Sequence, residues 1–109
     1  MRASKLESDF QADLIHELKD LFPGCMVLKN DSAYLQGVPD LIVLYQTHWA
    51  MLEVKASPNS RKQPNQDYYV DMLDDMSFAA FIYPENKKVV LDELQHAFRA
   101  RRSARVSQR

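Results

Sequence analysis

The sequence contains little glycine and almost no cysteine, and each shortage excludes a class of protein. Two glycines in 109 residues are too few for a glycine-rich phosphate loop, which excludes P-loop and dinucleotide-binding folds. The single cysteine, Cys25, excludes a disulfide within the chain and a cysteine-based zinc site. No apolar run reaches membrane-spanning length, and charge is spread through the first 20 residues, unlike a signal peptide. We therefore expect a single cytoplasmic domain with no membrane partner.

Charge is divided unevenly along the chain. Residues 1–98 carry nine Lys and Arg against 15 Asp and Glu, whereas residues 99–109 carry five arginines and no acid. A basic segment after an acidic body favours a polyanionic partner, with a frayed terminus as the alternative. We expect a domain over residues 4–98 and a basic tail over 99–109 that extends the last helix or is disordered. The tail residues expected to contact DNA are Arg99, Arg101, Arg102, Arg105 and Arg109.

Hydrophobic periodicity predicts three helices and four strands. The helices are expected over residues 4–22, 65–76 and 87–100, and the strands over residues 25–30, 40–45, 49–55 and 78–83. The short link Gln46-Thr47-His48 favours an antiparallel hairpin between the second and third strands. A helix between the third and fourth strands implies a crossover. The expected fold class is α/β, with a mixed central sheet flanked by helices.

Two acidic residues and a lysine should meet at one end of this hairpin. Period-2 geometry puts Glu53 and Lys55 on one face of their strand, with Leu52 and Val54 on the other. Counting back from the turn places Asp40 level with them. Two adjacent carboxylates repel unless a cation lies between them, and Mg²⁺ or Mn²⁺ prefers oxygen ligands. The pattern indicates metal-dependent phosphodiester hydrolysis, with a surface Glu–Lys pair as the alternative.

Two short segments resemble the signature of the PD-(D/E)xK nucleases. They are Gly37-Val38-Pro39-Asp40-Leu41-Ile42 and Leu52-Glu53-Val54-Lys55-Ala56, which match its GxPDL…LEVK form. Virus-type replication-repair nucleases (VRR-NUC) and Holliday-junction resolvase-like proteins of phages and archaea share this form. The resemblance covers roughly residues 7–83 and implies the restriction-endonuclease-like αβββαβα core. It also implies that Asp40 and Glu53 bind Mg²⁺ or Mn²⁺ and that Lys55 is catalytic.

Polar residues of the first predicted helix extend the resemblance. Glu7 and Gln11 fall on its apolar arc, where a carboxylate and an amide are unexpected unless something polar lies there. They resemble the E…Q pattern of family members, which implies that Glu7 is catalytic and a third metal ligand, and that Gln11 faces DNA. The alternative is that Glu7 forms a capping box with Ser4 as N-cap, and that Gln11 packs at the boundary.

Further resemblances lie before and after the hairpin. Gln66, at the start of the second helix, is similar to a glutamine that faces the active site in VRR-NUC proteins, with Gln63 as its competitor. Lys29 and Asn30 resemble the KN pair before the GxPD loop and imply a DNA-facing role, with an exposed strand end as the alternative. In the polar loop that follows the third strand, Arg61 and Lys62 are expected to contact backbone phosphates.

The function expected from these residues is metal-dependent endonucleolytic cleavage of DNA, in phage-type recombination, repair or genome processing. Branched or junction DNA is one substrate class that the resemblance implies, and host cytoplasm is the location of a phage-encoded enzyme. The alternative is a nucleic-acid-binding module that keeps the fold without cleavage. Intact Asp40, Glu53 and Lys55 argue against it. So small a domain has little room for specificity elements, which favours a homodimer or a partner protein.

Overall fold

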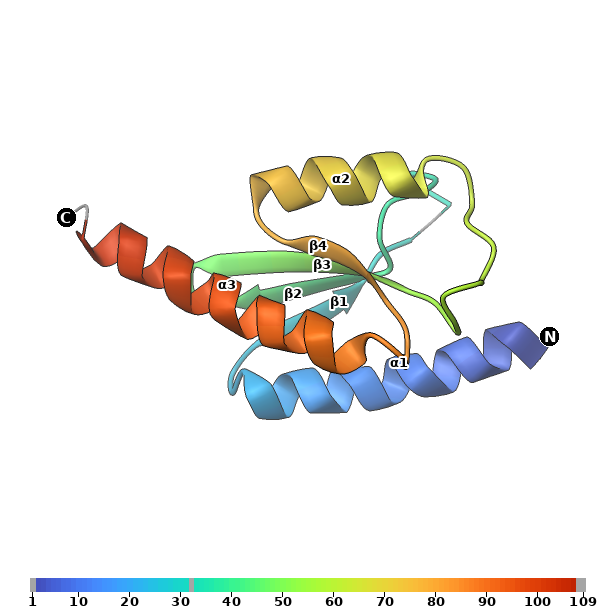
Figure 1. The fold of residues 1–109 in the computed structure, drawn as a ribbon, viewed down its shortest axis with the longest axis horizontal. Coiled ribbons are helices and arrows are strands. Elements are labelled where there is room, and N and C mark those ends of the chain that lie inside the picture. Colours follow the sequence, from blue (N-terminus) through green and yellow to red (C-terminus); the bar gives the residue numbers. More distant parts are fainter. Residues whose placement is uncertain (1, 32, 108–109) are drawn as a thin grey trace.

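One four-stranded sheet with helices on both faces makes up the protein in a computed structural model that describes residues 2–31 and 33–107 (Figure 1). In chain order the elements are α1 (Arg2–Leu21), β1 (Met26–Lys29), β2 (Leu41–Tyr45), β3 (His48–Val54), α2 (Gln66–Met76), β4 (Ala79–Ile82) and α3 (Lys87–Ser107). The predicted α/β class, with three helices and four strands, is confirmed. Within the described residues, none of the helices is long and apolar enough to cross a membrane.

The sheet is mixed, as predicted, and its strands follow the order β1-β2-β3-β4. β1 pairs with β2 and β2 with β3 in antiparallel fashion, whereas β4 runs parallel to β3 because α2 carries the chain back between them. The hairpin turn is shorter than expected. His48 pairs with Tyr45 as the first residue of β3, and its ring is buried against Phe98 with 5.2 Å between the centroids. The expectation that His48 belongs to the turn is therefore wrong.

The main core lies between the sheet and the two helices α1 and α3. Alternate residues of β2 and β3 face this side, which buries Leu41, Val43 and Leu52 completely. The helices contribute their apolar stripes, with Leu14, Leu18 and Phe22 from α1 and Leu91, Leu94 and Phe98 from α3. Since every second strand residue is used here, the intervening ones, including Glu53, must face α2.

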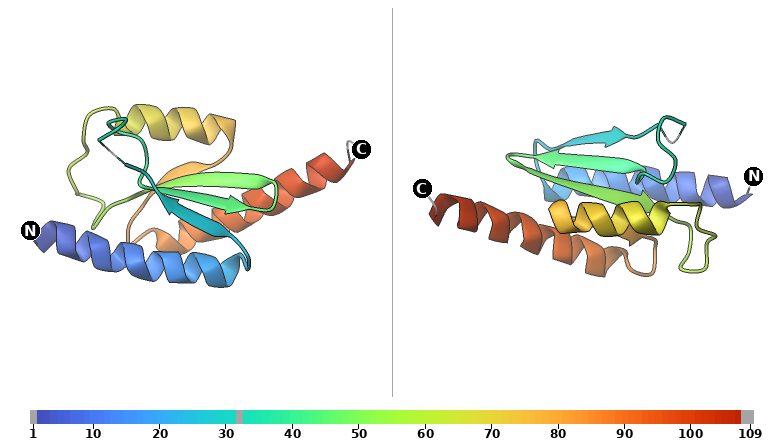
Figure 2. Two further views of the ribbon diagram at one scale, coloured as in Figure 1. Left: turned by 180° about the vertical axis from the view of Figure 1, so that it is seen from behind. Right: turned by 90° about the horizontal axis from the view of Figure 1, so that it is seen from above.

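The opposite face of the sheet is only half covered. α2 packs on β3 and β4, where Val70 lies in a small cluster with Met51 and Ala79. In the view from above, α2 lies over that side of the sheet and β1 lies outside it (Figure 2). The apolar side chains of β1 on this face are consequently exposed, Met26 by 57% and Leu28 by 42%, and so is Leu44 of β2 by 38%.

Two helix boundaries differ from the sequence prediction. α1 begins at Arg2, so Ser4 lies inside the helix and the predicted N-cap at Ser4, with its capping box, is wrong. α3 continues through the arginine-rich segment to Ser107. The side chains of three tail arginines and the whole of a fourth lie outside the described part of the chain, namely Arg101, Arg102, Arg105 and Arg109.

Candidate active site

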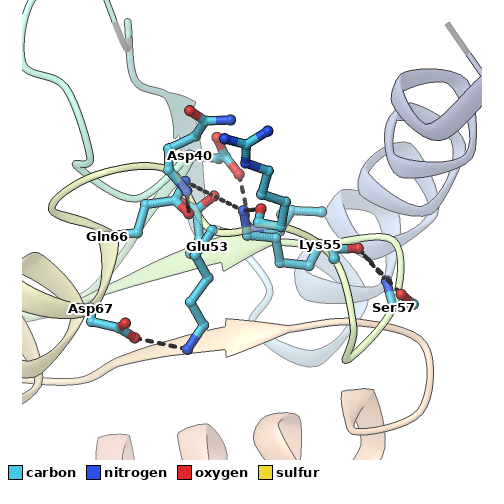
Figure 3. Close-up of polar contacts among 11 residues, drawn as sticks. Asp40, Glu53, Lys55, Ser57, Gln66 and Asp67 are labelled. Carbon is cyan, nitrogen blue, oxygen red and sulfur yellow. Dashed lines mark hydrogen bonds and ion pairs between the residues drawn. The ribbon is translucent and has the colours of Figure 1, made fainter.

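Four polar side chains converge at the end of the sheet where β3 stops: one from just before β2, two from the end of β3 and one from the start of α2 (Figure 3). Leu41 pairs with Leu52, so Asp40, one residue before β2, stands opposite Glu53. The Asp40 Oδ2 atom accepts a hydrogen bond from the Val54 amide at 2.9 Å, which fixes the carboxylate beside the strand end. The predicted meeting of Asp40 with Glu53 at the hairpin end is therefore found. The other members of the group are Lys55 and Gln66.

Glu53 is the most buried acidic group of the site, with 3% of its surface exposed. Its Oε2 atom accepts from Gln66 Nε2 at 2.9 Å and lies 3.8 Å from the Lys55 ammonium. Its Oε1 atom is buried and accepts no hydrogen bond from the described residues. When Glu53 is protonated, its carboxyl group can share the proton with Asp40. Burial raises the pKa of Glu53 to about 8, and the negative charge of Asp40 adds to this effect while the Lys55 charge opposes it. Without a cation, the protonated form of this carboxyl group is therefore favoured.

Lys55 is held close to Glu53 by backbone rather than by a second carboxylate. Its amide donates to the Ile82 carbonyl of β4 at 2.9 Å, which extends the sheet by one residue and directs the side chain to the α2 side. Its Nζ atom donates to the Arg61 carbonyl at 3.0 Å, because the loop after β3 folds back over it. With 8% of Lys55 exposed, the ammonium is fixed in position at the mouth of the site.

Gln66, at the start of α2, is the glutamine that contacts the Glu53 carboxylate, and Gln63 is not. The side chain of Gln66 is held at both ends, because its Oε1 atom accepts from the Gln63 amide at 2.9 Å while its Nε2 atom reaches the site. Gly37 secures this arrangement from the other side. Its φ is +95°, and a Cβ atom there would lie 2.7 Å from both the Asn65 Cβ atom and the Pro64 carbonyl oxygen. Only glycine lets the Asp40 loop pack so closely on the beginning of α2.

The first helix brings Glu7 toward the same end of the sheet. Partial burial raises the pKa of Glu7, the Asp40 charge raises it further, and the Lys55 charge lowers it. Glu7 is thus within electrostatic range of the site. Gln11, one turn further along α1, is half-buried and takes no part in the contacts that join the four central residues.

Asn30 supports the loop that carries the first carboxylate. Its backbone amide donates to the Asp40 carbonyl at 2.8 Å, and its side-chain Nδ2 atom donates to the Pro39 carbonyl at 2.7 Å. Lys29 is exposed at the end of β1, and strand alternation directs it to the α1 side of the sheet, away from Glu53. The two residues of the predicted KN pair therefore lie on different sides of the strand end.

The remaining predicted basic residues are spread over the molecule. Arg61 is exposed, and it contributes its carbonyl to the site. Lys62 pairs with Asp67 at 2.8 Å and lies 4.6 Å above the centre of the Phe81 ring, so its charge is partly engaged within the protein. Arg99 is exposed beside Phe98, at the hairpin-turn end of the sheet and so opposite the carboxylates.

Asp40 and Glu53 fit a hard divalent cation held by two carboxylates. The buried Glu53 Oε1 atom is an oxygen ligand that lacks a protein donor, and Asp40 has two oxygens, of which one suffices for Val54. Within the described part of the chain, no group of three acidic, His or Cys side chains is close enough to share an ion. Glu7 therefore does not complete a third ligand in this arrangement. Mg²⁺ accepts such a site, because waters usually supply several of its ligands.

The chemistry that these residues offer follows from their charges. A pair of carboxylates suited to a cation lies beside a fixed ammonium and a glutamine, a set that can bind and polarise an anionic ester. The Arg61 carbonyl and the Asn30 contacts were not anticipated, because a backbone acceptor carries no sequence signal and a loop anchor depends on how the loop closes.

No family model matches the chain, and a search of curated proteins finds no significant match.

Proposed function

We propose that this protein is a metal-dependent deoxyribonuclease of the PD-(D/E)xK type that hydrolyses phosphodiester bonds in DNA. The observation that carries the proposal is the buried Oε1 atom of Glu53, an oxygen next to a second carboxylate that accepts from no donor among the described residues. Leaving such an atom unpaired is costly. A divalent cation between Glu53 and Asp40 would remove that cost and would replace the proton that the metal-free site favours, so that both groups could carry their charge.

The order of elements and the sequence signature give independent support. The Pro-Asp before β2 and the Glu-x-Lys at the end of β3 stand at neighbouring strand ends, as the PD-(D/E)xK signature requires of its acidic and basic residues. The order α1-β1-β2-β3-α2-β4-α3 is the one expected for the restriction-endonuclease-like core. The VRR-NUC and Holliday-junction resolvase-like nucleases are the subfamilies we infer, with roles in recombination, repair or genome processing.

In this mechanism Asp40 and Glu53 would hold the ion, and Lys55 and Gln66 would assist from beside it. A bound Mg²⁺ or Mn²⁺ supplies Lewis-acid polarisation of the phosphate and lowers the pKa of the attacking water. The Lys55 ammonium, fixed by the Arg61 carbonyl, can offset negative charge that develops on the phosphate. Gln66 donates to the Glu53 Oε2 atom and so fixes the orientation of this carboxylate, which would favour binding of an ion.

The test is cleavage of end-labelled duplex, single-stranded, flap and four-way-junction DNA with Mg²⁺, Mn²⁺ or EDTA. We expect cleavage with either ion and none with EDTA, and we expect Asp40→Asn and Glu53→Gln to abolish it while both variants remain folded. Asp71→Asn is the matched control, since it neutralises an exposed carboxylate on α2. Full activity in either site variant, or activity that survives EDTA, would contradict the proposal. DNA binding by the wild type with no cleavage of any substrate would favour the non-cleaving module instead.

A further inference from the structure

A cavity lies between the loop that follows β1 and the α2 side of β3. The cavity measures about 500 Å³ and is lined by Asn30, Asp31, Tyr34, Leu35, Val38 and Met51. Most of this lining is apolar, and its amide and carboxylate residues, Asn30 and Asp31, are adjacent in the sequence. Cavities of this size are large enough to hold a small planar ligand.

Strand geometry fixes the position of the cavity relative to the carboxylates. Met51 lies on the same face of β3 as Glu53 and two residues before it, a separation of about 6.6 Å along the strand. On the other side, Asn30 is bonded to Pro39 and Asp40. The cavity therefore begins within about 7 Å along β3 of the pair that would hold the scissile phosphate.

Tyr34 is the exposed ring of this cavity. It is 89% exposed, so core packing does not account for an aromatic residue at this position. A loop tyrosine that borders an apolar cavity is suited to stack on a planar ring, because its own ring is rigid and has few rotamers to lose. Asn30 and Asp31 offer side-chain oxygens that can accept from ring N–H and amino groups.

We propose that this cavity binds an unpaired nucleobase of the nucleotide adjacent to the cleaved phosphate. The inference rests on the proposed nuclease function and adds the substrate class to it. A base inside an intact duplex is stacked and paired, and it must leave both arrangements to enter such a cavity. The preferred DNA is accordingly one with an unpaired nucleotide at the cleavage position, as in a single strand, a flap or a branch point.

The experiment compares base-containing DNA with DNA that lacks one base. The cleavage site of a flap substrate is mapped first, and a tetrahydrofuran abasic nucleotide is then moved through the positions on either side of it. We expect one position at which loss of the base lowers kcat/KM at least ~5-fold, the lower end for stacking of a base on an aromatic side chain. Tyr34→Ala should lower kcat/KM by a similar factor on the intact flap and change nothing on the abasic one. Tyr34→Phe should retain wild-type rates.

The matched control is Tyr68→Ala, which removes a second exposed tyrosine from α2, outside the cavity. It should leave both substrates unaffected. If the wild type cleaves the flap but neither the abasic scan nor Tyr34→Ala has an effect, the cavity proposal is wrong and the nuclease proposal stands. If the wild type cleaves nothing, the nuclease proposal fails, and the cavity proposal is tested by measuring DNA affinity instead. Tyr34→Ala must then weaken the affinity for a fluorescent single strand, but not for its abasic counterpart.

If a second copy of the chain binds to this face instead of a nucleobase, the same variants give a different result. In that case Tyr34→Ala would reduce cleavage of intact and abasic flaps equally and would lower the mass measured by sedimentation. That outcome would assign the surface to an interface between copies and would overturn the proposal.

Discussion

The pH dependence of folding stability should be governed by Glu53, and replacing its carboxylate with an amide should remove that dependence. Burial, with a contribution from the Asp40 charge, raises the pKa of Glu53 from 4.5 to about 8 in the metal-free protein. The folded protein thus keeps a proton over a pH range in which the unfolded chain has released it. The stability that this proton contributes is fully present below about pH 4.5, decreases as the pH rises, and is lost near pH 8.

The raised pKa of Glu53 sets an upper limit on how much the free energy of unfolding changes with pH. Each pH unit within this window lowers the free energy of unfolding by at most ~1.4 kcal/mol. Between pH 5 and pH 8 the upper bound is about 4 kcal/mol, and we expect ~2 kcal/mol, because solvent reaches the partly exposed Asp40 and Glu7 and screens the charge. A glutamine at position 53 has no charge to bury and can still accept from Gln66. Glu53→Gln should therefore exceed the wild type in stability at pH 8 by about the same ~2 kcal/mol.

The assay is urea unfolding in EDTA at one-unit intervals from pH 5 to pH 8. Trp49, the single tryptophan of the sequence, is half-buried in β3 and reports the transition by fluorescence. The wild type should lose stability across this range, whereas Glu53→Gln should stay nearly level. Asp71→Asn, with its exposed carboxylate on α2, should follow the wild type. Parallel curves for the wild type and Glu53→Gln would refute the argument, because the buried carboxyl group would then not be the titrating one.

The stabilisation of the fold by a bound divalent ion should depend on pH in the opposite sense to the stabilisation by the Glu53 proton. A cation that binds only the folded state stabilises it by ~1.4 kcal/mol at ten times its Kd. Protons and the cation compete for Glu53, so the stabilisation by Mg²⁺ or Mn²⁺ should increase from pH 5 to pH 8. Glu53→Gln should lose most of this gain at every pH. An equal gain in the variant would mean that the ion binds elsewhere.

Three further predictions concern the residues around the carboxylates. Lys55→Ala should lower kcat by two or more orders of magnitude with little change in DNA affinity. Lys55→Arg should also lose activity, because a planar guanidinium does not replace a compact ammonium. Single-turnover kinetics at saturating DNA test both variants. Gly37→Ala should destabilise the fold by about 1–3 kcal/mol in urea unfolding, since the added Cβ atom meets the backbone at Pro64. Removing residues 99–109 should weaken DNA binding and flatten the log–log salt slope by up to about 4 units, with kcat at saturation unchanged. Sedimentation of the truncated chain separates this effect from loss of a dimer contact.

Strand periodicity was sufficient to predict the centre of the site. An apolar residue at every second position determines which side chains face the core, so Glu53 and Lys55 had to share the other face. The register was predicted only to within one residue: the expected link of three residues sets Asp40 opposite Val54, whereas the observed turn of two residues pairs Tyr45 with His48 and sets Asp40 opposite Glu53. These are local rules, and they hold for any sheet that buries one face against a helix pair.

The parts that could not be predicted depend on contacts between distant segments. His48 looked like a turn residue, but Phe98 of α3 provides a ring for it to stack on, and β3 begins at His48 instead. The choice between Gln63 and Gln66 depended on where α2 starts. The sequence also could not predict that α2 covers only part of the sheet, because the pattern of an amphipathic helix of 11 residues does not indicate how many strands the helix crosses.

The arginine-rich end of α3 lies far from the carboxylates, and this distance determines what the tail can do. α3 begins beyond β4 at the site end and passes Phe98 near the hairpin turn (Figure 1). From His48 to Glu53 the strand advances about 17 Å, so the tail begins about five base pairs from the scissile phosphate if the DNA follows the sheet. Duplex arms shorter than this on the tail side should bind the full-length and truncated proteins equally. Longer arms should bind the full-length protein more tightly, in a salt-dependent manner. Affinities measured over a series of arm lengths test this, and a tail effect that is independent of arm length would show that the arginines contact DNA close to the site.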